Sequence, residues 1–158
     1  MDVENLNSMM IDILKEIGNI GSGNAATALA SMISKRVNMD VPQVRIMEFN
    51  DVARVLGGEE KLVVGIYFDL NDEVDGNIMF ILDLESAINL TNILLNRTSK
   101  EDELDDMAIS ALSEVGNILA SSYVNSLSAL TGLKISISIP SLAIDMAGAI
   151  LSVPAIQF

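Results

Sequence analysis

The chain has 158 residues, half of them hydrophobic, and carries a net charge of −13 with no Cys and no His. This length fits one compact domain with a sizeable core, and the acidic balance argues against nucleic acid and anionic membranes as partners. The absence of Cys and His excludes disulfides, thiolate metal sites and the commonest general base. The acidic start, Met1 to Glu4, predicts no signal peptide, so a cytoplasmic location is expected.

The chain opens with a predicted long helix. From Leu6 to about Val37, apolar residues recur at spacings near 3.6. Three glycines, Gly18, Gly21 and Gly23, interrupt this pattern, and each costs about 1 kcal/mol relative to Ala inside a helix. We expect them to permit close approach by another backbone.

A short strand and a short helix are predicted next. Pro42 ends the turn after the long helix, and Gln43 to Phe49 is expected to be a strand. Asn50 is expected to cap a helix from Asp51 to Leu56, which Gly57-Gly58 ends.

An antiparallel hairpin is the clearest prediction in the first half. Leu62 to Leu70 is rich in β-branched and aromatic residues, Asn71 to Asp75 is a polar turn, and Gly76 to Leu82 is the returning strand. Asp83 is expected to cap a helix that runs from Leu84 to about Asn96.

The segment from Arg97 to Asp106 is polar and acidic. It is interpreted either as a solvated linker or as an acidic first turn that the helix dipole favours. A second long helix is then predicted from about Glu103 to Leu130, and Thr131-Gly132 ends it.

The last third predicts one more strand and one more helix. Ile135 to Ile139 alternates as a strand and leads through Pro140 to Ala143, and Ala147 to Val153 is expected to be helical. The hydrophobicity of this region raises the alternative of a membrane span from Ile135 to Ile156. An internal Asp and two prolines favour a buried strand and helix instead.

One motif occurs twice, with an offset of 98 residues at every position. It consists of an acidic or hydroxyl residue, Glu four residues later, Asn seven residues later and Pro thirty residues later. The two copies are Asp12, Glu16, Asn19 and Pro42, and Ser110, Glu114, Asn117 and Pro140.

The repeat predicts a single domain over residues 1–158, with repeat one at about 6–96, a linker at about 97–102 and repeat two at about 103–158. The offset puts the counterpart of the first hairpin near residue 160, so the second repeat is expected to lack it. A truncated chain, an omitted stretch or another way of closing the sheet would each account for this. An open sheet edge recruits another strand, and a strand-exchanged homodimer is one outcome.

The motif residues lie on one helix face, because positions i, i+4 and i+7 line up. Asn is a poor helix former, so its presence in both helices requires a reason. It could simply bond a neighbouring backbone, with Glu solvated. Alternatively, the carboxamide could position a water for phosphoryl transfer, while the carboxylate holds a Lys of a partner that supplies the phosphate and the metal.

The segment from Glu16 to Ala28, EIGNIGSGNAATA, and its weaker twin from Glu114 to Ser122 resemble the CheC family of chemotaxis phosphatases, which is related to CheX and to the phosphatase domain of FliY. The resemblance covers essentially the whole chain. It implies an α/β (α+β) pseudo-twofold fold with two long motif-bearing helices on a continuous, mainly antiparallel sheet.

The resemblance also implies an activity, which is hydrolysis of the phospho-aspartate of the response regulator CheY. Asn19 and Asn117 would orient water, while Glu16 and Glu114 would pair with the active-site Lys of the regulator. Pro42 and Pro140 would be structural, whereas Asp12 and Ser110 would fill a variable position.

No cofactor of its own is implied, because Mg²⁺ would belong to the regulator. Some family members bind the receptor deamidase CheD. A non-catalytic adaptor or FliY-like switch domain that binds CheY or CheD is the alternative function.

Overall fold

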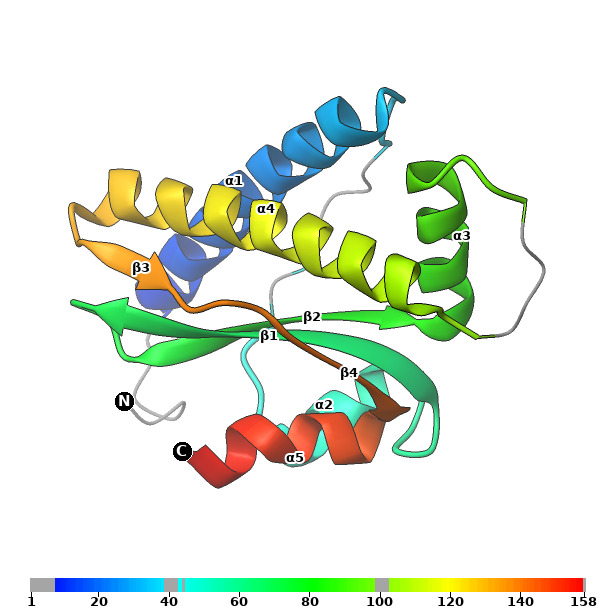
Figure 1. Ribbon diagram of the computed structural model, residues 1–158. Coiled ribbons are helices and arrows are strands. Elements are labelled where there is room, and N and C mark those ends of the chain that lie inside the picture. Colours follow the sequence, from blue (N-terminus) through cyan, green and yellow to red (C-terminus); the bar gives the residue numbers. More distant parts are fainter. Residues whose placement is uncertain (1–7, 39–42, 44, 99–102, 158) are drawn as a thin grey trace.

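A four-stranded antiparallel sheet lies at the centre of the molecule, and helices cover both of its faces (Figure 1). The computed structural model describes residues 8–38, 43, 45–98 and 103–157. The strands are β1 (Leu62–Asp72), β2 (Gly76–Asp83), β3 (Ile135–Ile137) and β4 (Ser141–Met146). The helices are α1 (Ser8–Ile33), α2 (Phe49–Val55), α3 (Leu84–Leu94), α4 (Asp106–Thr131) and α5 (Ala147–Gln157).

Strand β1 is paired along both edges. One edge pairs with β2 from Val63 to Leu70, which confirms the predicted hairpin. The other edge pairs with β4 and then with β3. Since β3 and β4 come from the second repeat, β1 joins the two halves of the chain into one sheet.

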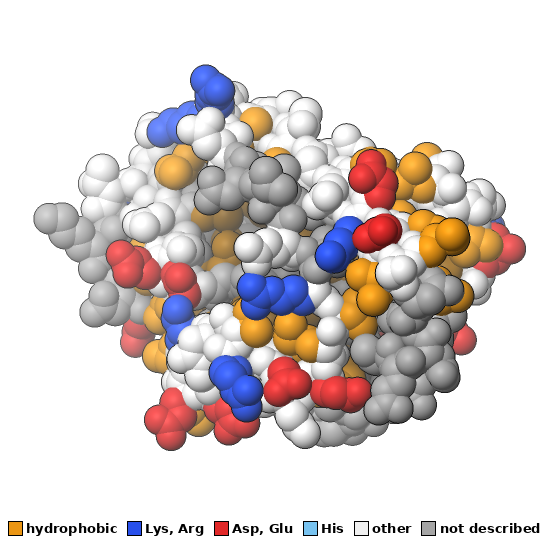
Figure 2. All heavy atoms as spheres, turned by 180° about the vertical axis from the view of Figure 1, so that it is seen from behind, with side chains coloured by type: hydrophobic (Ala, Val, Ile, Leu, Met, Phe, Trp, Pro, Cys, Tyr) orange, Lys and Arg blue, Asp and Glu red, His pale blue; other side chains and the backbone are white. Residues whose placement is uncertain are grey.

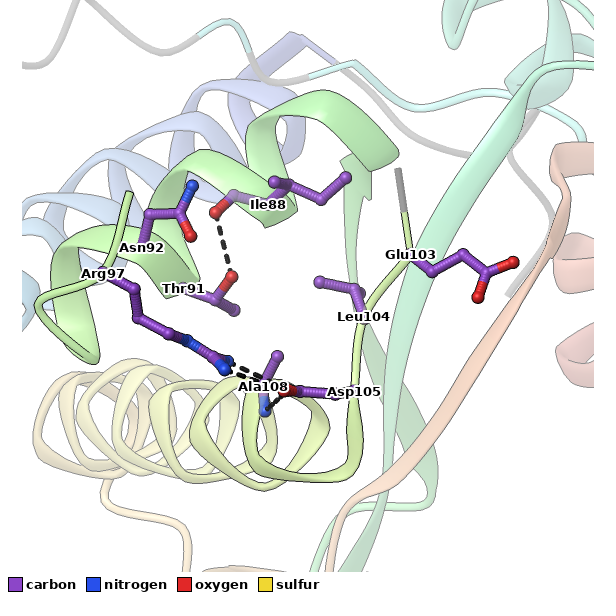
Figure 3. A pocket seen from close by; sticks show the side chains of 8 residues that line it. All are labelled: Ile88, Thr91, Asn92, Arg97, Glu103, Leu104, Asp105 and Ala108. Carbon is purple, nitrogen blue, oxygen red and sulfur yellow. Dashed lines mark hydrogen bonds and ion pairs between the residues drawn. The ribbon is translucent and has the colours of Figure 1, made fainter. Parts of the chain in front are cut away.

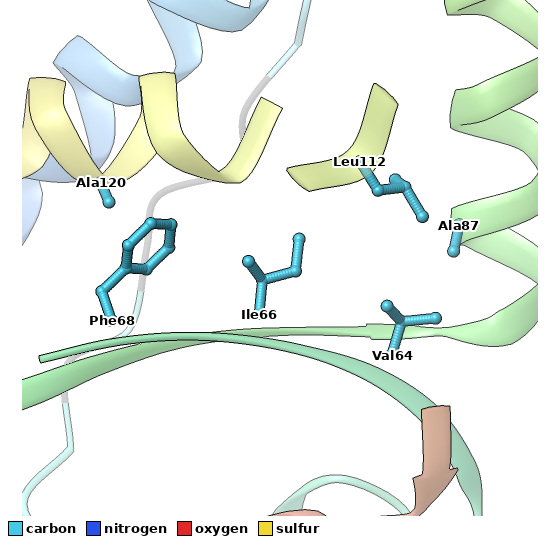
Figure 4. Close-up of a cluster of buried hydrophobic side chains, with 6 residues drawn as sticks. All are labelled: Val64, Ile66, Phe68, Ala87, Leu112 and Ala120. Carbon is cyan, nitrogen blue, oxygen red and sulfur yellow. The ribbon is translucent and has the colours of Figure 1, made fainter. Parts of the chain in front are cut away.

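Alternate side chains of β1 enter two separate cores, as the period of a strand requires. Figure 4 shows Val64, Ile66 and Phe68 pointing toward α4, where they pack with Leu112 and Ala120. On the opposite face, Val63 packs against α5. Helix α4 therefore lies directly on the sheet, whereas α1 packs chiefly on α4.

The strand predicted from Gln43 to Phe49 is wrong over the described residues. Residues 45–48 are irregular, and Phe49 already begins α2. At the 98-residue offset, residues 45–48 correspond to part of β4, whose ladder partner is β1. A strand forms only where it has a partner, and no described strand pairs with residues 45–48.

Several predicted boundaries also change. Asn50 does not cap α2: Glu48 occupies the N-cap position and makes no side-chain capping bond. The predicted strand at Ile135 becomes two strands, with three residues, 138–140, opposite two residues of β1. This is the pattern of a bulge, and Pro140 lies within it. Helix α5 continues past Val153, the expected end of this helix, to Gln157.

Other local signals are confirmed. Asp83 caps α3, and its carboxylate accepts a 2.7 Å hydrogen bond from the backbone N–H of Ser86. Gly57 and Gly58 end α2 with positive φ angles of 102° and 111°. Gly132 ends α4 in the left-handed conformation, where a side chain would be strained.

At Gly21 on α1 and at Gly116 on α4, a side chain approaches closely, where the sequence led us to expect a backbone at Gly21. A Cβ on Gly21 would lie 2.6 Å from the ring of Tyr123, and one on Gly116 would lie 2.7 Å from Cγ2 of Ile66. A Cβ on Gly23 would meet no described atom within 4 Å outside the adjoining backbone of its own helix. A neighbouring side chain therefore packs on Gly21 and on Gly116, but none packs on Gly23 among the described residues.

These surroundings give opposite predictions for two identical substitutions. Gly116→Ala should lower the free energy of unfolding by about 1–2 kcal/mol, because the fully packed, β-branched Ile66 cannot move aside. Gly23→Ala should raise it by about 0.5–1 kcal/mol through helix propensity. Urea unfolding followed by circular dichroism measures both, and equal effects would contradict the packing described here.

Candidate functional site

The two motif stripes have the same pattern of exposure. On α1, Asp12 and Glu16 are exposed and Asn19 is half-buried, and on α4 the same holds for their counterparts. Those counterparts are Ser110, Glu114 and Asn117. Within the described part of the chain, neither Glu16 nor Glu114 forms a hydrogen bond or ion pair, so both carboxylates are available to a partner.

A buried glycine accounts for this pattern. Gly116 faces Ile66 of the sheet, and it fixes which side of α4 points inward. With 3.6 residues per turn, Glu114 lies roughly 160° around the helix from Gly116, and Asn117 roughly 100° around it. The carboxylate must therefore face solvent and the amide must lie at the boundary. Gly18 is buried in the same relative position on α1.

Helices α1 and α4 cross just after the stripes. The ring of Tyr123 packs on Gly21, and burial raises the pKa of that tyrosine. Nearby, Nδ2 of Asn24 donates a 2.7 Å hydrogen bond to Oγ of Ser126. Figure 1 shows the two helices crossing obliquely, with the start of α1 at the left and the start of α4 at the right, so the two stripes, which precede the crossing, lie on opposite sides of it.

A groove beside this crossing shows the internal symmetry. Every residue of α1 that lines it has a counterpart on α4, 98 residues later, that also lines it. The pairs are Asn24 and Ser122, Thr27 and Asn125, Ala28 and Ser126, and Ser31 and Ala129. The repeat seen in the sequence is therefore a pseudo-twofold relation of the two helices in space.

An ion pair anchors the start of α4 (Figure 3). The guanidinium of Arg97 makes 2.7 and 2.9 Å hydrogen bonds to the two carboxylate oxygens of Asp105. The same carboxylate caps α4 by accepting from the N–H of Ala108. Together these donors lower the pKa of Asp105 to about 2. The acidic first turn was one of the two sequence interpretations of this segment, and it holds for Asp105 and Asp106.

Asn19 carries an uncompensated polar atom. Its Oδ1 is buried and has no hydrogen-bond partner among the described residues, so this oxygen does not make the backbone bond that the alternative interpretation allowed. An unpaired buried acceptor costs about 1–3 kcal/mol. Such groups often mark functional positions, where stability is not the selected property.

Of the two prolines of the motif, the structure describes only one. Pro42 lies outside the described residues, while Pro140 lies at the bulge between β3 and β4. In the described ranges, no three carboxylates gather as a metal site would require. Nor is any helix of those ranges long and apolar enough to cross a membrane.

Sequence reasoning missed the residues that hold the site in place. Tyr123 and Ser126 were not singled out, and Arg97 was assigned only to a polar segment. The signal for Tyr123 was present but indirect, since an inserted ring needs a glycine opposite it. The pairing of Arg97 with Asp105 could not be read, because it depends on how α3 and α4 pack.

Comparisons with known proteins repeat the two-fold pattern. A family model described as the CheC-like family matches residues 9–46 and 107–144. The second segment begins and ends 98 residues after the first, since 107 minus 9 and 144 minus 46 both give 98. The family match thus falls on the two motif helices and on the segments that follow them.

One curated relative is the CheY-P phosphatase CheC of Bacillus subtilis, with 34% identity over 90% of this chain and 69% of the relative. Among solved structures, Thermotoga maritima FliY matches with a TM-score of 0.76 and 27% identity, over 89% of this chain and 70% of that one. A CheX–CheY–BeF₃–Mg²⁺ complex from Borrelia burgdorferi matches with a TM-score of 0.57 and 23% identity, over 81% of this chain and 74% of that one. The last likeness is one of fold.

The anchor of α4 predicts a pH effect on stability. Because the folded pKa of Asp105 lies below its ordinary value, its stabilising contribution is present above about pH 4 and is lost as the pH falls toward about 2. Asp105→Asn keeps a capping side chain but loses the charge. We expect its unfolding free energy to depend less on pH over this range than that of the parent, and parallel profiles would contradict the assignment.

Asn19→Ala is expected to leave the free energy of unfolding unchanged or to raise it by up to about 1 kcal/mol, because it removes the unpaired oxygen and a poor helix former. Asn24→Ala is the matched control, since it gains the same helix propensity but loses the bond to Ser126. It should be less stable than Asn19→Ala by about 1 kcal/mol. A loss above about 1 kcal/mol for Asn19→Ala would show that Asn19 supports the fold.

Proposed function

The chain belongs to the CheC-like family, and from this premise we propose that it accelerates hydrolysis of the phospho-aspartate of CheY. The observation that carries the proposal is the repeated stripe, in which an exposed carboxylate precedes a half-buried carboxamide by one turn. The identity to a named CheY-P phosphatase supports the reaction, and the complex of the fold relative CheX with CheY supports the partner.

In the proposed mechanism, the side chain of Asn19, whose Oδ1 is buried in the free chain, rotates outward, and its carboxamide or that of Asn117 enters the active site of the regulator. Its oxygen accepts a hydrogen bond from the attacking water, and its NH₂ group donates one to hold the orientation. The water oxygen bonds to phosphorus while the bond from phosphorus to the aspartyl oxygen breaks. Inorganic phosphate leaves, and the aspartate is restored as a carboxylate.

Glu16 and Glu114 have a docking role in this proposal. Each lies one turn before its Asn and faces solvent without a partner in the described part of the chain. Each carboxylate pairs with the active-site Lys of the regulator and so aligns the amide with the phosphoryl group. The Mg²⁺ belongs to the regulator, because the catalysis asked of this chain is only positioning.

The test is the decay of CheY-phosphate with Asn19→Ala, Asn117→Ala and the double variant. Orienting one water is worth about 3 kcal/mol, or about a hundredfold in rate. The double variant should therefore return decay close to that of the regulator alone, while each single variant keeps the activity of its other site. Asn125→Ala, an exposed Asn of α4 outside both stripes, is the control and should keep full activity. A double variant as active as the parent would refute the mechanism.

A FliY-like switch or adaptor domain is the second candidate. The structural match to Thermotoga maritima FliY, with a TM-score of 0.76, supports a switch domain, whereas the FliY of Bacillus subtilis is itself named a flagellar motor switch phosphatase. This function predicts that the chain binds phosphorylated CheY without changing its decay. Binding of CheD and a strand-exchanged homodimer stay predictions from the family resemblance and the repeat, and co-purification and light scattering respectively would test them.

A further inference from the structure

The two motif helices share one more residue that packing does not explain. Met9 and Met107 lie at matched positions, three residues before Asp12 and Ser110. Their side chains are 69% and 63% exposed. Three residues is nearly one helical turn, so each Met lies beside the first residue of its stripe.

Identity between the repeats has a packing reason at the glycines of the two motifs. Gly116 matches Gly18, and both are buried. Hydrophobic side chains are exposed among charged ones on the rear face (Figure 2), so a single exposed Met would need no reason. Two at matched places beside two matched stripes do need one.

We propose that Met9 and Met107 are docking residues, each of which contacts the regulator at its own site. This proposal rests on the proposed function. The occupant is the surface of CheY around its active-site Lys. Charge complementarity supports this choice, because the unpartnered carboxylates of Glu16 and Glu114 continue the same face toward Asn. Along each helix, the surface therefore presents an apolar Met, then an anionic Glu, and then the amide of Asn.

The spacing separates docking from chemistry. Each Met precedes its Asn by ten residues, which is about 15 Å along a helix axis at about 1.5 Å per residue. The methionine therefore cannot reach the phosphoryl group that the amide serves. Its contribution falls on binding of the regulator. The unbranched thioether adapts to an irregular partner surface better than a branched side chain does.

The experiment compares Met9→Ala/Met107→Ala with the parent in CheY-phosphate hydrolysis. Loss of an apolar contact at each site should raise KM about fivefold and leave kcat unchanged. Met9→Leu/Met107→Leu keeps the apolar contact and should restore most of the affinity. The control is Val55→Ala at the end of α2, where the side chain is 55% exposed and the sheet lies between it and the two motif helices (Figure 1), and its KM should not change.

A second measurement keeps the outcome separate from the proposed function. Titration with CheY activated by BeF₃ and Mg²⁺ gives Kd whether or not the chain hydrolyses anything. If the parent does not accelerate decay but the Met variant binds about fivefold more weakly, the phosphatase proposal fails and the docking proposal stands. An unchanged Kd and KM in the Met variant, or an equal rise in Val55→Ala, overturns the docking proposal.

Discussion

The contact between Ile66 of β1 and Gly116 of α4 determines how the rest of the molecule is presented. Gly116 does no chemistry, yet its missing side chain lets α4 settle on the sheet at one rotation. That rotation turns Glu114 outward and puts Asn117 at the boundary between solvent and protein. The motif therefore combines one packing residue, Gly116, with two residues that face the solvent or its boundary, Glu114 and Asn117. Strand β1 sets the orientation of a site that it does not touch.

The sequence predicted what depends on local or repeated signals. Helix periodicity gave both long helices, the hairpin followed from β-branched residues around a polar turn, and Asp83 and Gly132 ended their elements as expected. The strand at residues 43–48 could not be judged locally, because its state depends on a distant ladder partner. The ring of Tyr123 on Gly21 and the pairing of Arg97 with Asp105 depend on packing between helices, which spacing alone does not determine.

The two copies of the motif share a pattern but not an environment. Helix α3 covers the start of α4, and its residue Ala87 lies in the same cluster as Leu112. No described element covers the matching part of α1 in the same way, so Leu14 is 40% exposed where Leu112 is fully buried. If the two stripes perform the same chemistry, they do so on helices that differ in how much of their surface is packed against the rest of the protein.

That difference in packing has a consequence for local motion. A segment that buries little apolar surface opens at a lower free energy than the global unfolding transition. Helix α1 rests chiefly on α4, while α4 is fixed by the sheet, by α3 and by its capped start. The amide hydrogens of α1 should therefore exchange with solvent in a separate, earlier opening event than those of α4. The stripe on α1 would then open more often than the stripe on α4. A partner that binds the α1 stripe would slow amide exchange there more than a partner bound at the α4 stripe would.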